Sequence, residues 1–226
     1  REEWGADESL RFYDGEVENP KVIELSEETK EKFADELKIK KKITKQDGKT
    51  LIWPLEYSAD VTKFIIHHTA TDVKPGESMQ SVQDIYHSHA VFRGWGDIGY
   101  NYLIDQEGNI YEGRYGGEGV TGGHAGVGNI GSIGIAVLGT YSDNKVPKKV
   151  LAPLIKLIAE KSKIYGIDPD GYSQFRGEVS PNVIGHRDIM PTECPGEKLQ
   201  TLLPVIRTLA GQLTGTTTVS NIQRFQ

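Results

Sequence analysis

Short apolar runs rich in β-branched residues recur along this chain, separated by segments with a different spacing of apolar side chains. The runs VTKFIIHH (61–68), SIGIAVLGTY (132–141) and NVIGH (182–186) each predict a buried strand. YNYLID and IYEGR flank the short turn QEGN, an arrangement that predicts a β-hairpin over 100–114. The sequence therefore predicts at least five strands within the region from 61 onward.

Helical spacing dominates the segments between and after these strands. Residues 78–92 place apolar side chains on one face with Ser78 as a cap, and residues 147–166 form an amphipathic stretch that ends at a glycine. We expect a further helix over 195–213. Strands that alternate with helices and include one hairpin predict a single α/β domain, in which helices flank a central mixed sheet.

The N-terminal quarter has a different character. Residues 24–37 resemble an exposed helix with Ser26 as N-cap, and a lysine run over 38–49 ends in the turn QDGK. We interpret that lysine run as a solvated strand face or linker. The expected organisation is an N-terminal segment of the main domain (1–14), an extension or insertion of low functional content (15–60), the main domain (61–213) and a tail (214–226).

Composition narrows the function. The 226 residues are 37% hydrophobic with a formal net charge of −6, and mean hydropathy is −0.44. The negative charge argues against a nucleic-acid partner, and no apolar stretch approaches the roughly 20 residues that span a bilayer. The chain begins at Arg1, so we expect something upstream to have been removed, and the lack of a signal peptide says nothing about export.

The single cysteine, Cys194, follows His186 by eight residues, and the doublet His67-His68 ends an apolar run far upstream. Two strand-end imidazoles and one thiolate would give a zinc site with three protein ligands and an open fourth position. A lone cysteine is otherwise most often a small buried hydrophobe. The spacing alone leaves both interpretations open.

Six collinear motifs decide between them: FIIHHTAT, RGWGDIGYNYLID, IYEGR, GGHAG, SIGIAVLGTY and IGHRD…TECPGEKL. Their order resembles the zinc-dependent N-acetylmuramoyl-L-alanine amidases and the related peptidoglycan recognition proteins. The resemblance covers about 61–210, and the opening REEWGAD also looks like the start of that domain. It implies Zn²⁺ held by His67, His186 and Cys194. His68 then becomes a core residue or a residue beside the ligands, because adjacent strand residues point to opposite faces.

The resemblance also suggests the groups that assist the reaction. Tyr100 matches the catalytic tyrosine of the family and is the candidate for holding water or polarising the scissile carbonyl. Thr192 stands where the phage-type enzymes have a lysine, so it offers a hydrogen bond but no positive charge. Asp188 is expected either to orient a ligand or to cap a turn.

Further residues match positions that line the substrate groove of the family. His124, in the glycine-rich loop 115–131, is expected to line the groove, and Tyr115 to form its floor or wall. His89 is as well explained by packing as by substrate contact. For Arg93 and Trp95 we expect a structural anchor. The predicted substrate-binding residues are His124, His68, His89 and Tyr115.

The leading hypothesis is a zinc amidase that hydrolyses the bond between N-acetylmuramic acid and L-alanine of the peptidoglycan stem peptide. Peptidoglycan or a muropeptide is then the partner, and the protein works outside the cell or in the cell envelope. We expect a monomer, although the sequence does not determine the oligomeric state. One alternative is a peptidoglycan-binding module without catalysis. Another is an intracellular amidase that recycles anhydro-muropeptides.

Overall fold

The computed structural model describes residues 1–13, 25–74 and 76–215. Most of the expected tail (214–226) and part of the expected insertion (15–60) lie outside these ranges. Within the described residues, no helix is long and apolar enough to cross a membrane.

A five-stranded mixed sheet forms the centre of the molecule, in the strand order β5-β4-β6-β3-β9. The central strand β6 pairs in parallel with both β3 and β4. Strand β9 joins in parallel at one edge and β5 antiparallel at the other. The strands are β3 (Lys63–His68), β4 (Tyr102–Ile104), β5 (Ile110–Glu112), β6 (Ser132–Val137) and β9 (Val183–Gly185).

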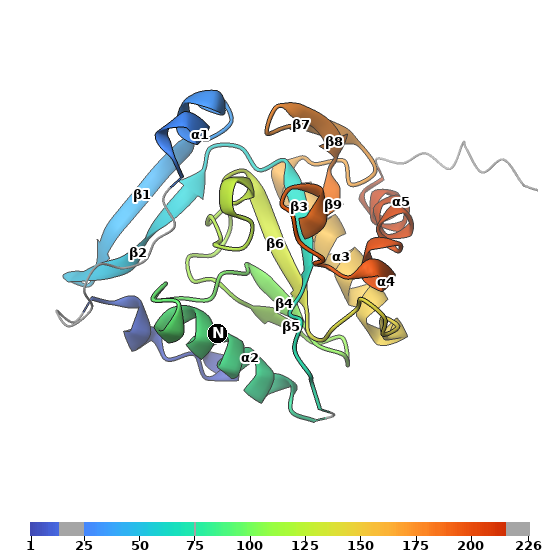
Figure 1. The fold of residues 1–226 in the computed structure, drawn as a ribbon, viewed down its shortest axis with the longest axis horizontal. Coiled ribbons are helices and arrows are strands. Elements are labelled where there is room, and N and C mark those ends of the chain that lie inside the picture. Colours follow the sequence, from blue (N-terminus) through green and yellow to red (C-terminus); the bar gives the residue numbers. More distant parts are fainter. Residues whose placement is uncertain (14–24, 75, 216–226) are drawn as a thin grey trace, which may run out of the picture.

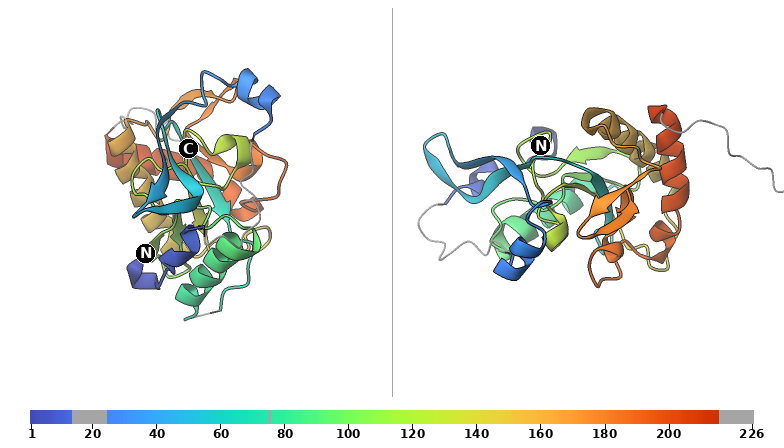
Figure 2. Two further views of the ribbon diagram at one scale, coloured as in Figure 1. Left: turned by 90° about the vertical axis from the view of Figure 1, so that its left-hand side faces the viewer. Right: turned by 90° about the horizontal axis from the view of Figure 1, so that it is seen from above.

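Two long helices, α3 (Lys148–Tyr165) and α5 (Leu203–Thr214), cover one face of this sheet, as Figure 2 shows in two further views. Alternate residues of β6, Ile133 and Ile135 among them, point into the core beneath these helices. Leu154 and Ile158 of α3 pack against them, and α5 adds Ile206. Burial of this apolar layer is the main stabilising contribution to the fold.

Helix α2 (Ser78–His87) and the N-terminal segment cover the opposite face (Figure 1). A π-helical turn, Ser88–Phe92, continues α2, and the N-terminal segment holds two 3₁₀ turns, Glu2–Trp4 and Glu8–Arg11. Trp4 is buried and its ring packs edge-on against Tyr86 of α2, 5.4 Å between centroids. The N-terminal segment is thus an integral part of this layer.

The N-terminal quarter also forms a separate arm on the left in Figure 1, made of α1 (Glu27–Lys32) and the antiparallel hairpin β1 (Ile39–Gln46) and β2 (Lys49–Ser58). Ser26 caps α1 by accepting from the Thr29 N–H at 3.2 Å, as the sequence predicts. The turn Asp47-Gly48 has positive φ at both residues, the conformation that a tight hairpin of this kind requires.

The structure confirms the predicted fold class and corrects two details. The single helix predicted over 195–213 is wrong: α4 (Glu197–Gln200) ends before α5 begins at Leu203. Pro204 accounts for the break, because proline has no N–H to donate and its ring excludes a preceding helical turn. The hairpin β7 (Tyr172–Phe175) and β8 (Glu178–Pro181) was not predicted, because only one residue of its two strands is buried and the strands show no apolar alternation.

Candidate metal centre

Two neighbouring parallel strands bring two histidines together. Strands β3 and β9 pair with Ile66 opposite Gly185, so His67 and His186 follow at the same edge of the sheet. Their ring centroids lie 4.5 Å apart. The predicted pairing of strand-end imidazoles is therefore present.

Cys194 reaches the same point from the loop that follows β9. The Arg187 N–H donates to the Cys194 carbonyl at 2.8 Å and closes that loop. The sulfur lies 3.6 Å from Nδ1 of His67. One ligand atom from each of His67, His186 and Cys194 falls within 4.8 Å of the others, the only such group of three among the described residues.

The side chains of His67 and His68 point to opposite faces of the sheet, because successive residues of strand β3 alternate between its faces. His67 lies on the face that carries the cluster, whereas the Nδ1 of His68 accepts a hydrogen bond from the Tyr141 N–H at 3.2 Å. The backbone N–H of His68 donates to the Cys194 sulfur at 3.4 Å. His68 thus contributes its backbone to the cluster and directs its side chain away.

Burial keeps the imidazoles neutral, as metal ligands must be. It lowers the pKa of His67 well below the usual range, and the nearby imidazoles of His124 and His186 lower it further. The pKa of His186 is lowered for the same reason, and its Nε2 is buried without a hydrogen-bond partner among the described residues. Burial raises the pKa of the Cys194 thiol to about 11, a shift that a bound cation would reverse.

His124 lies in direct contact with this cluster. Its Nδ1 is 3.0 Å from Nε2 of His67, and burial lowers its pKa to about 3. The side chain of Asn129 fixes the loop by accepting from the N–H groups of His124 and Ala125. Gly134 provides the space for the His124 ring, because a Cβ at position 134 would overlap that ring. The sequence predicts a groove histidine here but gives no sign of this hydrogen bond to His67.

An aromatic row runs from the cluster toward the hairpin arm. It consists of His67, Tyr100, His89, Trp95 and Trp53, with successive ring centroids 5.0–5.7 Å apart. Burial raises the pKa of Tyr100, which keeps its phenol protonated. His89 accepts from the Gly99 N–H at 3.1 Å, and burial lowers its pKa to about 4.

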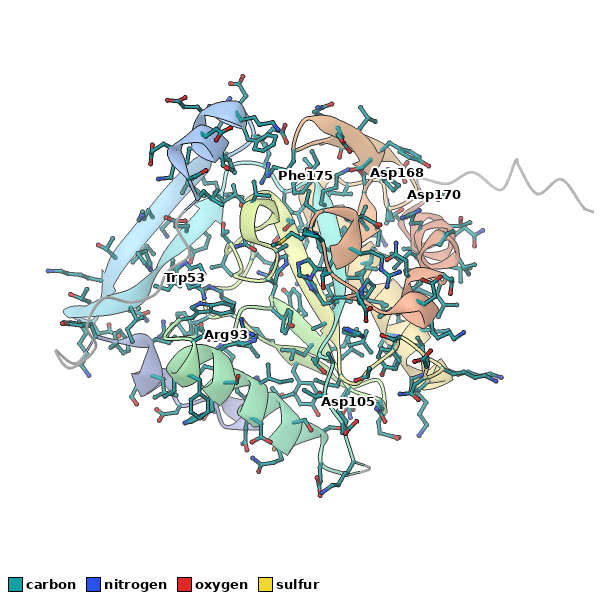
Figure 3. The ribbon with its side chains drawn as sticks, in the orientation of Figure 1. Trp53, Arg93, Asp105, Asp168, Asp170 and Phe175 are labelled. Carbon is teal, nitrogen blue, oxygen red and sulfur yellow. The ribbon has the colours of Figure 1, made fainter. Side chains whose placement is uncertain are left out.

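Trp95 is buried as expected of a structural anchor, whereas Arg93 places a positive charge at the surface. The Arg93 guanidinium lies 5.0 Å from the Trp95 ring centroid. Trp53, on β2, packs edge-on against Trp95, and Figure 3 labels both Trp53 and Arg93. Sequence reasoning missed Trp53, because it lies in a segment to which we assigned low functional content.

Two of the remaining predicted residues, Thr192 and Asp188, lie in the segment that carries the ligands, and the third, Tyr115, lies elsewhere. Thr192 is exposed and its hydroxyl oxygen accepts from the Cys194 N–H at 3.2 Å. Asp188 accepts from the Gly185 N–H at 2.8 Å and so caps the turn after β9. Tyr115 lies apart from the metal cluster: it lines a cavity of about 650 Å³ between the N-terminal segment and the hairpin, with the Arg11 guanidinium 3.5 Å from its ring centroid.

The metal cluster, Tyr100 and His124 all fall within one sequence match. Residues 57–197 match the family model described as N-acetylmuramoyl-L-alanine amidase, which is more than half of the chain. The chain belongs to this amidase family. The match begins at 57, so α1, β1 and almost all of β2 lie outside it.

Known relatives agree with this assignment. Peptidoglycan-recognition protein LB of Drosophila melanogaster is 36% identical over 140 residues, which are 60% of this chain and 54% of that protein. The match therefore spans about half the length of this relative. Its solved structure superposes with a TM-score of 0.55 at 34% identity and covers 65% of this chain and 82% of that one.

Two other solved structures share the fold. One is the N-acetylmuramoyl-L-alanine amidase LysC from Clostridium intestinale, with a TM-score of 0.52, 30% identity, and coverage of 64% of this chain and 83% of that one. The other is an ectodomain complex of peptidoglycan recognition proteins LCa and LCx with tracheal cytotoxin bound. It has a TM-score of 0.57, 28% identity, and coverage of 66% and 84%.

Proposed function

We propose that this member of the family is a zinc-dependent amidase that hydrolyses the bond between N-acetylmuramic acid and L-alanine of peptidoglycan stem peptides. The observation that carries the proposal is the convergence of His67, His186 and Cys194 donor atoms within 4.8 Å, beside Tyr100. A wall polymer as substrate implies work outside the cell or in its envelope. The family membership and the LysC neighbour support the reaction class.

The donor set suits zinc. Two neutral imidazoles and one thiol are ligands that zinc prefers, and three protein ligands leave a fourth position for water or substrate. The Nε2 of His186, buried without a partner in the described part of the chain, and the N–H that His68 directs at the sulfur both fit a ligand role. When bound, zinc would lower the pKa of its water and polarise a substrate carbonyl.

The imidazole pair His67–His124 sets the position of one proton. If Nδ1 of His67, which faces the Cys194 sulfur, is the ligand atom, its Nε2 carries the proton and donates to Nδ1 of His124. A neutral His124 then carries its own proton on Nε2, which has no partner among the described residues. The hydrogen bond to His124 would thus hold the His67 ring in the tautomer that leaves its Nδ1 available to the metal.

Tyr100 and Thr192 complete the catalytic set. The protonated phenol of Tyr100, 5.2 Å from His67 between ring centroids, can donate to the scissile carbonyl. The Thr192 oxygen holds the Cys194 N–H and so fixes the ligand loop, while its own hydroxyl proton is left to donate to substrate. No lysine is needed for either role.

A direct test measures release of stem peptide from a purified muropeptide, together with zinc content by mass spectrometry. We expect one zinc per chain, and we expect Cys194→Ser to lose both the metal and the activity while it keeps its circular dichroism spectrum. Ser173→Ala, a serine in the β7–β8 hairpin, is the matched control and should keep both. A wild-type protein that binds zinc but cleaves no muropeptide would contradict the proposal.

The same experiment separates the alternatives. A binding module would hold muropeptide without cleavage, and its affinity would not change in Cys194→Ser. A recycling amidase would turn over soluble anhydro-muropeptide faster than intact wall material. We expect turnover of intact wall material that stops when a chelator removes the metal.

A further inference from the structure

The hairpin arm and the glycine-rich loop enclose a second cavity, of about 430 Å³, which is distinct from the metal cluster. One wall comes from α1, β1 and β2, and the other from the loop that holds His124. The family match excludes almost all of the first wall. Its aliphatic lining consists of Leu25, Ala34, Leu37, Ile39 and Ile130.

Trp53 connects this cavity to the metal centre. It lines the cavity, and it also ends the aromatic row that begins at His67. The Arg114 guanidinium lies 4.6 Å from the Trp53 ring centroid and is fully buried, so this contact marks the interior side of the ring. Gly123 allows the close approach, because a Cβ there would lie 2.8 Å from the Trp53 ring.

The row also sets a length. Its four centroid steps of 5.0–5.7 Å place Trp53 no more than about 21 Å from His67, a span that about six extended residues cover. Tyr100, His89 and Trp53 are each partly exposed along the row. A stem peptide whose first amide bond lies at the metal cluster can therefore reach the cavity with its last residues.

The lining chemistry favours a peptide over a saccharide. A sugar needs several free polar side chains, but the uncharged ones of the cavity are already engaged. Asn129 accepts from two backbone N–H groups, and the Thr121 hydroxyl bonds to Ser58. Small alkyl side chains such as those of alanine match the aliphatic surface.

Polar groups at the cavity can satisfy the ends of such a peptide. The backbone N–H of Gly122, which lines the cavity, donates to no acceptor in the described part of the chain and can serve a peptide carbonyl. Lys30 and Lys42 also line it, each in an exposed ion pair with a glutamate. Exposed pairs of this kind exchange partners at little cost, so a terminal carboxylate can bind there.

We propose that the cavity between the hairpin arm and the glycine-rich loop binds the distal, alanine-rich and carboxylate-terminated residues of the stem peptide, and so selects long stems over short ones. This inference rests on the proposed amidase function for its orientation. The arm then determines which substrates are preferred, while the metal cluster determines the reaction.

The test compares kcat/KM for N-acetylmuramoyl pentapeptide with kcat/KM for N-acetylmuramoyl dipeptide. Ala34 is exposed at the cavity, so Ala34→Trp fills it without disturbing the core. We expect the pentapeptide-to-dipeptide ratio to fall roughly tenfold in Ala34→Trp, the scale of a lost apolar subsite. Ala152→Trp, at an exposed alanine on α3, is the matched control and should leave the ratio unchanged.

Three results would overturn the inference. They are an unchanged ratio in Ala34→Trp, an equal fall in Ala152→Trp, and a preference that follows the number of sugar rings instead of stem length. If the wild type cleaves neither substrate, the proposed function fails and the cavity is judged by calorimetry with the free pentapeptide. Binding that Ala34→Trp abolishes then supports the cavity site, and absence of binding to the wild type rejects it.

Discussion

The two ends of the aromatic row are built in opposite ways. At one end, His67 is buried on a central strand, and His186 follows the neighbouring strand at the same sheet edge. At the other end, Trp53 and its neighbours belong to a two-stranded hairpin and a short helix without buried residues. Chemistry that needs fixed distances is placed on the sheet, and a surface that selects among substrates is placed on the arm.

Among changes that leave the metal ligands intact, the largest effect is expected at the sheet end, from Tyr100→Phe. This change removes the phenol that can donate to the scissile carbonyl, so activity should fall roughly 10²-fold or more on every muropeptide, with zinc content unchanged. Tyr102→Phe is the matched control, because Tyr102 lies on β4 against Lys161, away from the cluster. Steady-state kinetics on short and long stems check this, and a loss limited to long stems would argue against a catalytic role.

Two glycine-to-alanine substitutions, one at each end of the aromatic row, test whether reaction and substrate selection are separate. Both add the same methyl group. Gly134→Ala forces the His124 ring to move, and a shift of that kind beside reacting groups costs roughly tenfold to a hundredfold in activity. Gly123→Ala pushes the Trp53 ring instead. We expect Gly134→Ala to slow all substrates and Gly123→Ala to lower only the preference for long stems. Equal profiles for the two variants would show that the ends act as one unit.

The sequence was sufficient for the parts of the site that strands deliver. His67 and His186 each end a short apolar run, and their parallel neighbours in the sheet bring them to one edge, which pattern and resemblance together predict. The choice of His67 over His68 agrees with the two-residue period, since His68 bonds to the Tyr141 backbone. The fold class followed from the same alternation of strands and helices.

Contacts between distant loops were beyond that reasoning. The bond from His67 to His124 depends on how Asn129 folds the glycine-rich loop, and no periodicity reports such a turn. Tyr115, which we expected at the floor or wall of the groove, packs against Arg11, and no periodicity predicts that contact. Trp53 became visible only once the hairpin arm was placed beside Trp95.

Substitution of Lys63 tests the rigidity of the sheet end without changing any residue of the metal cluster. Its buried ammonium donates to the carbonyls of Ser173, Ser180 and Pro181 and so ties β3 to the hairpin β7–β8. Lys63→Met leaves these carbonyls unpaired, and we expect a loss of about 2–3 kcal/mol in the free energy of unfolding. Urea denaturation at pH 7 measures it. A loss below about 0.5 kcal/mol would show that water replaces the ammonium.

The same lysine gives a pH signature. Burial and, to a smaller extent, the charge of Arg207 lower its pKa from 10.5 to about 8, while Glu36 opposes the shift. Between these values the unfolded chain binds more protons than the folded one, so the contribution of Lys63 to stability rises as pH increases from about 8 to 10.5. Wild type should therefore gain stability relative to Lys63→Met across this window. A constant difference between the two proteins would contradict the lowered pKa.

The smallest effect is expected on the arm, from Lys42→Gln. Lys42 and Glu56 pair across the hairpin at 2.7 Å, but the Lys42 side chain is 54% exposed, so solvent screens most of the attraction. We expect a change of at most about 0.5 kcal/mol in unfolding free energy and no change in zinc content. Lys45→Gln, at an exposed lysine on the same strand, is the control. A larger loss in Lys42→Gln than in Lys45→Gln would show that the arm depends on this pair for its position. The arm would then be held by specific contacts, as the sheet end is.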